Sequence, residues 1–119
     1  MKEEKSIKGE LVIKNKGKEK TKKIEFLEIK EEPKGDWKEI KHKKSNKWLN
    51  SAVRVCHDDL KERVNLMNTK PQTTFYFLFN LDKIKYKVEI IVFSINEVHG
   101  EHGVLIDREL ETETKVFKE

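Results

Sequence analysis

The longest amphipathic pattern in the chain is SNKWLNSAVRVCHDDLKERVNLMNTKP, residues Ser45–Pro71. Ser45 or Asn46 can cap the start of a helix here, and Pro71 marks its end. At about 100° per residue, the apolar side chains fall on one wide arc. The arc consists of Trp48, Leu49, Ala52, Val53, Val55, Cys56, Leu60, Val64, Leu66 and Met67. The pattern therefore predicts a long helix with one side facing a core.

On both sides of this helix, apolar and polar residues alternate as they do in β-strands. Ahead of it, SIKGELVIK (Ser6–Lys14) and TKKIEFLEIK (Thr21–Lys30) flank a turn at Gly17, which predicts a β-hairpin. After it, TTFYFLF (Thr73–Phe79) and IKYKVEIIVFSI (Ile84–Ile95) predict two more strands joined by a short turn.

The end of the chain has a weaker pattern. NEVHGEHG (Asn96–Gly103) predicts a loop, while VLID (Val104–Asp107) and the run Leu110–Phe117 favour one more strand, frayed or at an edge. The order is then ββ-α-βββ. We expect a single α+β domain over residues 1–119, with an acidic C-terminal segment at 108–119. Its one long helix packs on an antiparallel sheet of about four to five strands.

The net charge of +4 is distributed unevenly along the chain. Residues 1–96 carry 23 Lys and Arg against 15 Asp and Glu, a balance of +8. Residues 97–119 carry 3 against 7, a balance of −4. A basic body favours a polyanionic partner, because each neutralised phosphate releases counterions. Heat adaptation or AT-rich coding also produces a bias towards Lys and Glu, and the residues leave this alternative open.

One stretch concentrates the positive charge, KHKKSNKW at Lys41–Trp48. Within the helix, three cations recur every seven residues, so they align opposite the apolar arc over about 10.5 Å for each step. Such a row can contact phosphates along a nucleic-acid backbone. The alternative is an ordinary solvated helix face. The candidate nucleic-acid-binding residues are Lys41, Lys43, Lys44, Lys47, Arg54 and Lys61.

Two charged residues lie inside the apolar arc of the helix. Asp59 and Arg63 are four residues apart, which predicts an ion pair half-buried against the core. In the alternative interpretation, Arg63 binds a carboxylate or phosphate of a partner through two hydrogen bonds. We prefer the structural pair, because a desolvated charge generally needs a partner within the fold.

The strand FYFLF places three phenylalanines on one face and two other apolar residues on the opposite face. Phe75, Phe77 and Phe79 are predicted to form the core beneath the helix. Base stacking by aromatic residues on a sheet is the alternative. If Tyr76 and Leu78 lie outward, they mark a homodimer or partner interface.

The loop HGEHG holds two of the four histidines, His99 and His102, with Glu101 between them. Imidazole and carboxylate ligands at this spacing can share a Zn²⁺ or Mn²⁺ ion. A complete site needs further ligands, and only Asp107 is near in sequence. A solvated hairpin loop is the interpretation that we prefer, and we expect no metal and no cofactor.

Signatures of catalysis are absent from the sequence, which has no glycine-rich phosphate loop, no nucleophile-elbow serine and no paired cysteines. We therefore expect no catalytic residue.

Cys56 is the single cysteine, so it cannot form an intramolecular disulfide, and its place on the apolar arc predicts an inert, buried side chain. The first ten residues contain no apolar run, and we expect a cytoplasmic protein with no membrane association.

Together, these patterns predict a small, basic, non-catalytic protein that binds nucleic acid through the lysine-rich stretch and the helix face. The residues do not discriminate between DNA and RNA. The alternative is an inhibitor or adaptor that binds a protein through sheet aromatics or an edge strand. A metal-dependent nuclease that uses the histidine loop is the third hypothesis.

Overall fold

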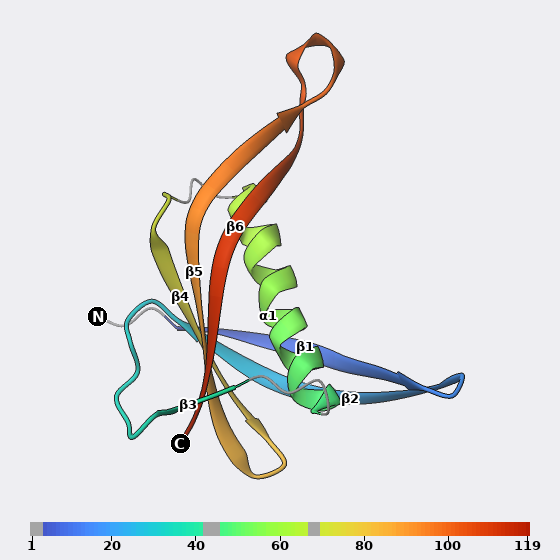
Figure 1. The fold of residues 1–119 in the computed structure, drawn as a ribbon, viewed down its shortest axis with the longest axis vertical. Helices are drawn as coiled ribbons and strands as arrows, with labels where there is room; N and C mark the ends of the chain where they lie inside the picture. The colour runs from blue at the N-terminus through green and yellow to red at the C-terminus, as the bar shows by residue number, and fades with distance from the viewer. Residues whose placement is uncertain (1–3, 42–45, 67–69) are drawn as a thin grey trace.

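The computed structural model describes residues 4–41, 46–66 and 70–119. Six antiparallel strands form one sheet in the order β1-β2-β4-β5-β6-β3, and a single long helix lies on one face of it (Figure 1). The elements are β1 (Glu4–Asn15), β2 (Lys18–Ile29), β3 (Lys38–Ile40), α1 (Lys47–Leu66), β4 (Thr73–Leu81), β5 (Ile84–His99), the 3₁₀ turn η1 (Glu101–Gly103) and β6 (Leu105–Lys118).

The α+β class with one helix on an antiparallel sheet is confirmed, but the prediction of four to five strands is wrong. The strand that it lacks is β3, whose three residues pair with Val116–Lys118 at the other end of the chain. The predicted loop at Asn96–Gly103 is also too long, because β5 continues to His99. Segment 108–119 lies mostly within β6, which pairs with β5 along most of its length.

Two hairpins extend beyond the body of the molecule. The β1–β2 hairpin and the β5–β6 hairpin leave the central part of the sheet in different directions, while α1 lies between them (Figure 1). The molecule measures 49 × 43 × 24 Å along its principal axes. The ends of the two hairpins are therefore separate, solvent-facing parts of one sheet.

The core lies between α1 and the helix-facing side of the sheet. Leu49, Ala52, Cys56, Leu60 and Val64 are buried on the predicted arc of α1. They cover a face of β4 and β5 that is equally apolar, because residues that pair across antiparallel strands share a face. The buried side chains of that face are Phe75, Phe77, Phe79, Tyr86, Val88, Ile90 and Val92. The predicted core role of the three phenylalanines is confirmed. The side chain of Leu66, and Met67, lie outside the described residues.

Hydrogen bonds are found near both ends of α1, one local and one from β6. Asn46 is the N-cap, since its Oδ1 accepts a hydrogen bond of 3.1 Å from the Leu49 N–H. Near the other end, Arg108 donates from Nη1 to the Val64 carbonyl at 3.3 Å, and its charge complements the helix dipole. Within the described residues, no helix combines the length and the apolar character needed to cross a membrane.

The helix packs closely against β1 at Gly9. A Cβ atom at this position would lie 2.5 Å from the ring of Phe26 and 2.8 Å from Cγ1 of Val55. Any side chain here would therefore separate α1 from β1 or displace the Phe26 ring. The close approach of the helix to the strand depends on this glycine.

A cluster of charges is buried between α1 and β2. Arg63 forms its ion pair with Glu28 of β2, so the predicted pair with Asp59 is wrong. Glu28 is only 3% exposed, and Asp59 is a second carboxyl beside it. Burial raises the pKa of Glu28 from 4.5 to about 7, outweighing the opposite effect of Arg63, and the Asp59 carboxyl raises this pKa further. Near neutral pH, Glu28 therefore exists in both protonation states.

We expect Gly9→Ala to destabilise the protein by about 1–3 kcal/mol, because the added methyl group overlaps Phe26 and Val55. Chemical denaturation measures this loss. The matched control is Gly100→Ala, whose Cβ would lie no closer than 3.3 Å to the exposed Ile106 side chain and 3.9 Å to the Val104 carbonyl oxygen. Equal denaturation midpoints for parent and Gly9→Ala would contradict the close packing of α1 on β1.

The Glu28 cluster predicts a pH-dependent stability. Because the folded state raises the pKa of Glu28, its protonated form stabilises the fold fully below about pH 4.5, and this contribution is lost as the pH rises through about 7. In Glu28→Gln this contribution no longer titrates. The melting temperature of the parent minus that of the variant should therefore fall between these two pH values. Glu25→Gln, an exposed change on the same strand, should follow the parent. Parallel curves for parent and Glu28→Gln would contradict the shifted pKa.

Candidate functional site

A groove runs between the edge strand β1 and the N-terminal half of α1. Its volume is about 390 Å³. The two walls are held together by a hydrogen bond of 2.9 Å from the Val12 backbone N–H to Oγ of Ser51. The residues lining the groove are Val12, Ile13 and Lys14 from β1, and Lys47, Asn50, Ser51 and Arg54 from α1.

The lining of this groove is positively charged. Lys14, Lys47 and Arg54 contribute three cations, and none of the seven lining residues is acidic. Lys47 and Arg54 are exposed and lie seven residues apart on the helix, a rise of about 10.5 Å. The groove therefore presents an electropositive surface of a size that can contact more than one phosphate.

The β1–β2 hairpin extends this basic surface. Residues 14–23 contain six lysines, at 14, 16, 18, 20, 22 and 23, and a single acidic residue, Glu19. In the strand register, Lys20 lies opposite Ile13, which lines the groove, so the two side chains share a face of the hairpin. Lys18 lies on the same face as Lys20, whereas Lys14 and Lys23 lie on the other face, opposite Glu19 and Glu10. Lys18 and Lys20 thus form a basic face of the hairpin that adjoins the groove at Ile13.

The structure places the six candidate residues in different surroundings. Lys47 and Arg54 meet in the groove, whereas Lys61 lies farther along the helix and pairs with Asp107 of β6, with 3.7 Å between Nζ and Oδ1. Lys41 is exposed just after β3. Lys43 and Lys44 lie outside the described residues.

Sequence reasoning missed Lys14 as a member of the site. Its role depends on β1 lying beside the first turns of α1, and no local pattern reveals that neighbour. The lysine-rich run NKGKEKTKK at Asn15–Lys23 was the available signal. It points to the hairpin as a basic element, although the groove itself becomes apparent only in the fold.

Neither tryptophan offers a free ring for base stacking beside the groove. Trp48 packs against the core, and Nζ of Lys22 lies 5.1 Å from the centre of its ring. Lys22 also forms a 2.9 Å ion pair with Asp82. Trp37 lies on the other face of the sheet, with Nζ of Lys87 5.3 Å from its ring centre. The groove thus offers cations and amides rather than aromatic platforms.

Lys87 is an unusual buried charge on the sheet face away from α1. It is only 2% exposed and lies between the rings of Trp37 and Phe117, with Nζ 4.2 Å from the centre of the latter. Glu32 and Glu89 compensate its charge at 3.5 and 3.6 Å. These contacts attach the β2–β3 connection to the sheet, so Lys87 has a structural role.

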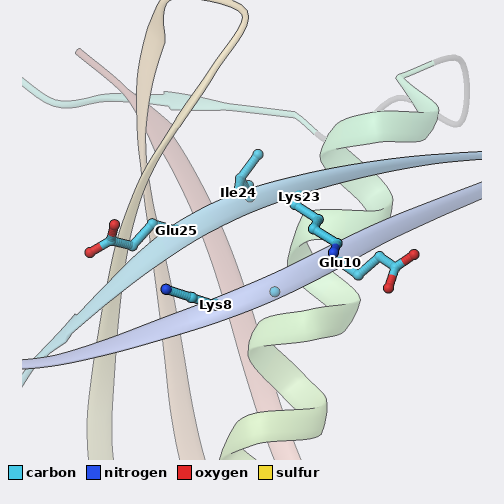
Figure 2. Close-up of a pocket in the computed structure, with 6 residues that line it drawn as sticks. Lys8, Glu10, Lys23, Ile24 and Glu25 are labelled. Carbon is cyan, nitrogen blue, oxygen red and sulfur yellow. The ribbon is translucent and has the colours of Figure 1, made fainter.

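A second hollow lies on the β1–β2 hairpin and has a volume of about 440 Å³. Lys8, Glu10, Lys23 and Glu25 project around it (Figure 2). In register, Lys8 faces Glu25 and Glu10 faces Lys23, so each cation is opposite an acid. This balanced surface lacks the positive excess of the groove beside α1.

In the loop with His99 and His102, His99 interacts with residues of the same hairpin. Both ring nitrogens of His99 have partners, since Nδ1 lies 3.1 Å from the Gly103 carbonyl and Nε2 lies 3.1 Å from Glu97. Over residues 4–41, 46–66 and 70–119, no group of three or more His, Cys, Asp or Glu side chains is arranged to hold a metal ion. Among the described residues, the histidine loop therefore does not form the ligand set that the nuclease hypothesis requires.

The sequence predicts an inert, buried Cys56 and an interface at Tyr76 and Leu78 if these two side chains lie outward. Cys56 is buried, and burial raises the pKa of its thiol well above the usual value, which makes it a poor nucleophile. Tyr76 and Leu78 are half-buried on the face away from α1. Cys56, Tyr76 and Leu78 carry no positive charge, whereas the groove is lined by three cations.

No family model, curated protein or solved structure matches this chain significantly. Function is therefore inferred from the contacts and charges of its own residues. Among the sites described above, the groove between β1 and α1 combines a concave shape, three cations and an adjoining basic hairpin. It is the strongest candidate for a functional site.

Proposed function

We propose that this protein binds nucleic acid through the groove between β1 and α1 and the basic face of the β1–β2 hairpin. The observation that carries the proposal is the convergence of Lys14, Lys47 and Arg54 around one groove without an acidic neighbour in its lining. Cations gathered in this way gain affinity for phosphates by releasing counterions.

The chemistry of the groove favours contacts with the sugar–phosphate backbone. Lysine and arginine side chains bind phosphate oxygens, and the Asn50 and Ser51 side chains can add polar contacts. None of the residues lining the groove is aromatic, and the nearby Trp48 is packed against the core. A two-stranded ribbon of the width of β1–β2 also fits the major groove of a duplex. We therefore propose a duplex as the preferred ligand, bound with little dependence on sequence.

A protein-binding role is the second candidate, and it is favoured by one observation. The β5–β6 hairpin exposes apolar side chains, of which Val104 is 60% and Ile106 is 64% exposed. Exposed apolar residues that cluster on one element often mark a contact with a protein.

The nucleic-acid proposal predicts the behaviour of the triple variant Lys14→Gln, Lys47→Gln, Arg54→Gln. Its affinity for duplexes of any sequence should fall, because phosphate contacts are lost and base contacts are not. The slope of log affinity against log salt should shrink by about 0.9 for each lost contact, or about 2.7 for all three. Fluorescence anisotropy at several salt concentrations measures both quantities, at protein concentrations low enough to keep the chain monomeric.

The matched control is Lys34→Gln, Lys70→Gln, Lys118→Gln, which removes the same charge from exposed positions outside the groove. It should keep the salt slope of the parent, because the slope counts phosphate contacts and none of these three lysines lines the groove. Equal losses in the two variants would mean that only net charge matters, and an unchanged slope in the groove variant would also contradict the proposal.

A further inference from the structure

The end of the β5–β6 hairpin carries an exposed apolar surface. Val104, Leu105 and Ile106 are consecutive and all exposed, although residues of this kind are usually buried. Gly100, across the turn, lies against Ile106. These residues project from the body on an extended hairpin (Figure 1). We refer to Val104–Ile106 as the apolar tip. An apolar surface displayed in this way is suited to insertion into a partner.

The surroundings of the apolar tip are acidic. Residues 97–109 contain four carboxylates, Glu97, Glu101, Asp107 and Glu109, against one cation, Arg108. Glu97 is paired with Arg108 and Asp107 with Lys61 of α1, which leaves Glu101 and Glu109 as the acidic side chains that a partner would meet beside the tip. Farther down β6, Glu109, Glu111 and Glu113 are exposed at alternate positions. A partner for this hairpin must therefore combine an apolar surface with positive charge.

The groove between β1 and α1 has this combination. Val12, which is exposed, and the half-buried Ile13 supply apolar side chains at its β1 wall. Lys14, Lys47 and Arg54 supply the opposite charge to the exposed Glu101 and Glu109. The two surfaces are complementary in both polarity and charge.

The apolar tip cannot fill the groove of its own molecule. The end of the β5–β6 hairpin lies at one end of the longest axis, along which the molecule extends 49 Å, and the beginning of α1 lies towards the other end (Figure 1). The two surfaces also belong to one continuous sheet and the helix packed on it. Their complementarity can therefore be satisfied only between two molecules.

We propose that the apolar tip of one copy docks into the groove between β1 and α1 of a second copy. Such a contact joins two different surfaces, so it is heterologous and leaves a free tip and a free groove at the ends of each dimer. This self-association is independent of the proposed function, although it uses the same groove. Nucleic acid and a second copy then compete for Lys47 and Arg54.

Two variants, each lacking one of the surfaces, test this contact in the absence of nucleic acid. Ile106→Asp places a charge in the apolar tip, and Lys47→Glu, Arg54→Glu reverses the charge of the groove. Sedimentation velocity at low salt should show that the average mass of the parent rises with concentration. Each variant alone should remain monomeric. An equimolar mixture should form a one-to-one dimer, because one variant keeps its groove and the other keeps its tip.

The control Lys34→Glu, Lys118→Glu makes the same charge change elsewhere and should associate like the parent. All of the altered side chains are exposed, and unchanged thermal unfolding verifies that each variant folds. A monomeric parent, a variant that still associates alone, or a mixture that stays monomeric would each overturn the proposal. Normal duplex binding by Ile106→Asp, combined with a loss of self-association, would separate the two uses of the groove.

Discussion

The packing of α1 on the phenylalanine face of the sheet is the contact on which the rest of the molecule depends. Phe75, Phe77 and Phe79 form a continuous apolar surface, and the arc of α1 covers it. Gly9 lets the helix come close to β1, and the ion pair of Arg63 with Glu28 ties it to β2. With the helix held in this position, its opposite face and the edge of β1 enclose the groove.

Positive and negative charges gather on different hairpins of the sheet. The β1–β2 hairpin and the start of α1 carry lysines and Arg54, whereas the β5–β6 hairpin carries carboxylates around an apolar tip. Salt weakens interactions between exposed charges, so the two proposed uses of the groove share a dependence on ionic strength. The two uses differ in the apolar surface that they bury, because only the proposed contact between copies would cover Val104 and Ile106, which are exposed in the single molecule. Competition for one groove would couple assembly of the protein to the presence of nucleic acid.

Much of the fold could be predicted because its signals are local. The helix and the long strands follow from the spacing of apolar residues. The rest depends on partners far away in the sequence. β3 has only three residues and pairs with the end of the chain, and Arg63 finds Glu28 at a separation of 35 residues. For the same reason, the sequence showed that Lys47 and Arg54 lie on one face of the helix. It did not show that Lys14 joins them in the groove or that Lys61 pairs with Asp107.

The most direct test of the groove as a nucleic-acid site is the map of backbone amide chemical shifts during titration with a short duplex. Ile106→Asp is the appropriate protein, because it cannot fill the groove with a second copy. The shifts should change along the end of β1, the turn of the β1–β2 hairpin and the first half of α1, with Lys14, Lys47 and Arg54 at the centre. Changes centred on the β5–β6 hairpin, or spread evenly over lysines such as Lys34 and Lys118, would contradict this assignment.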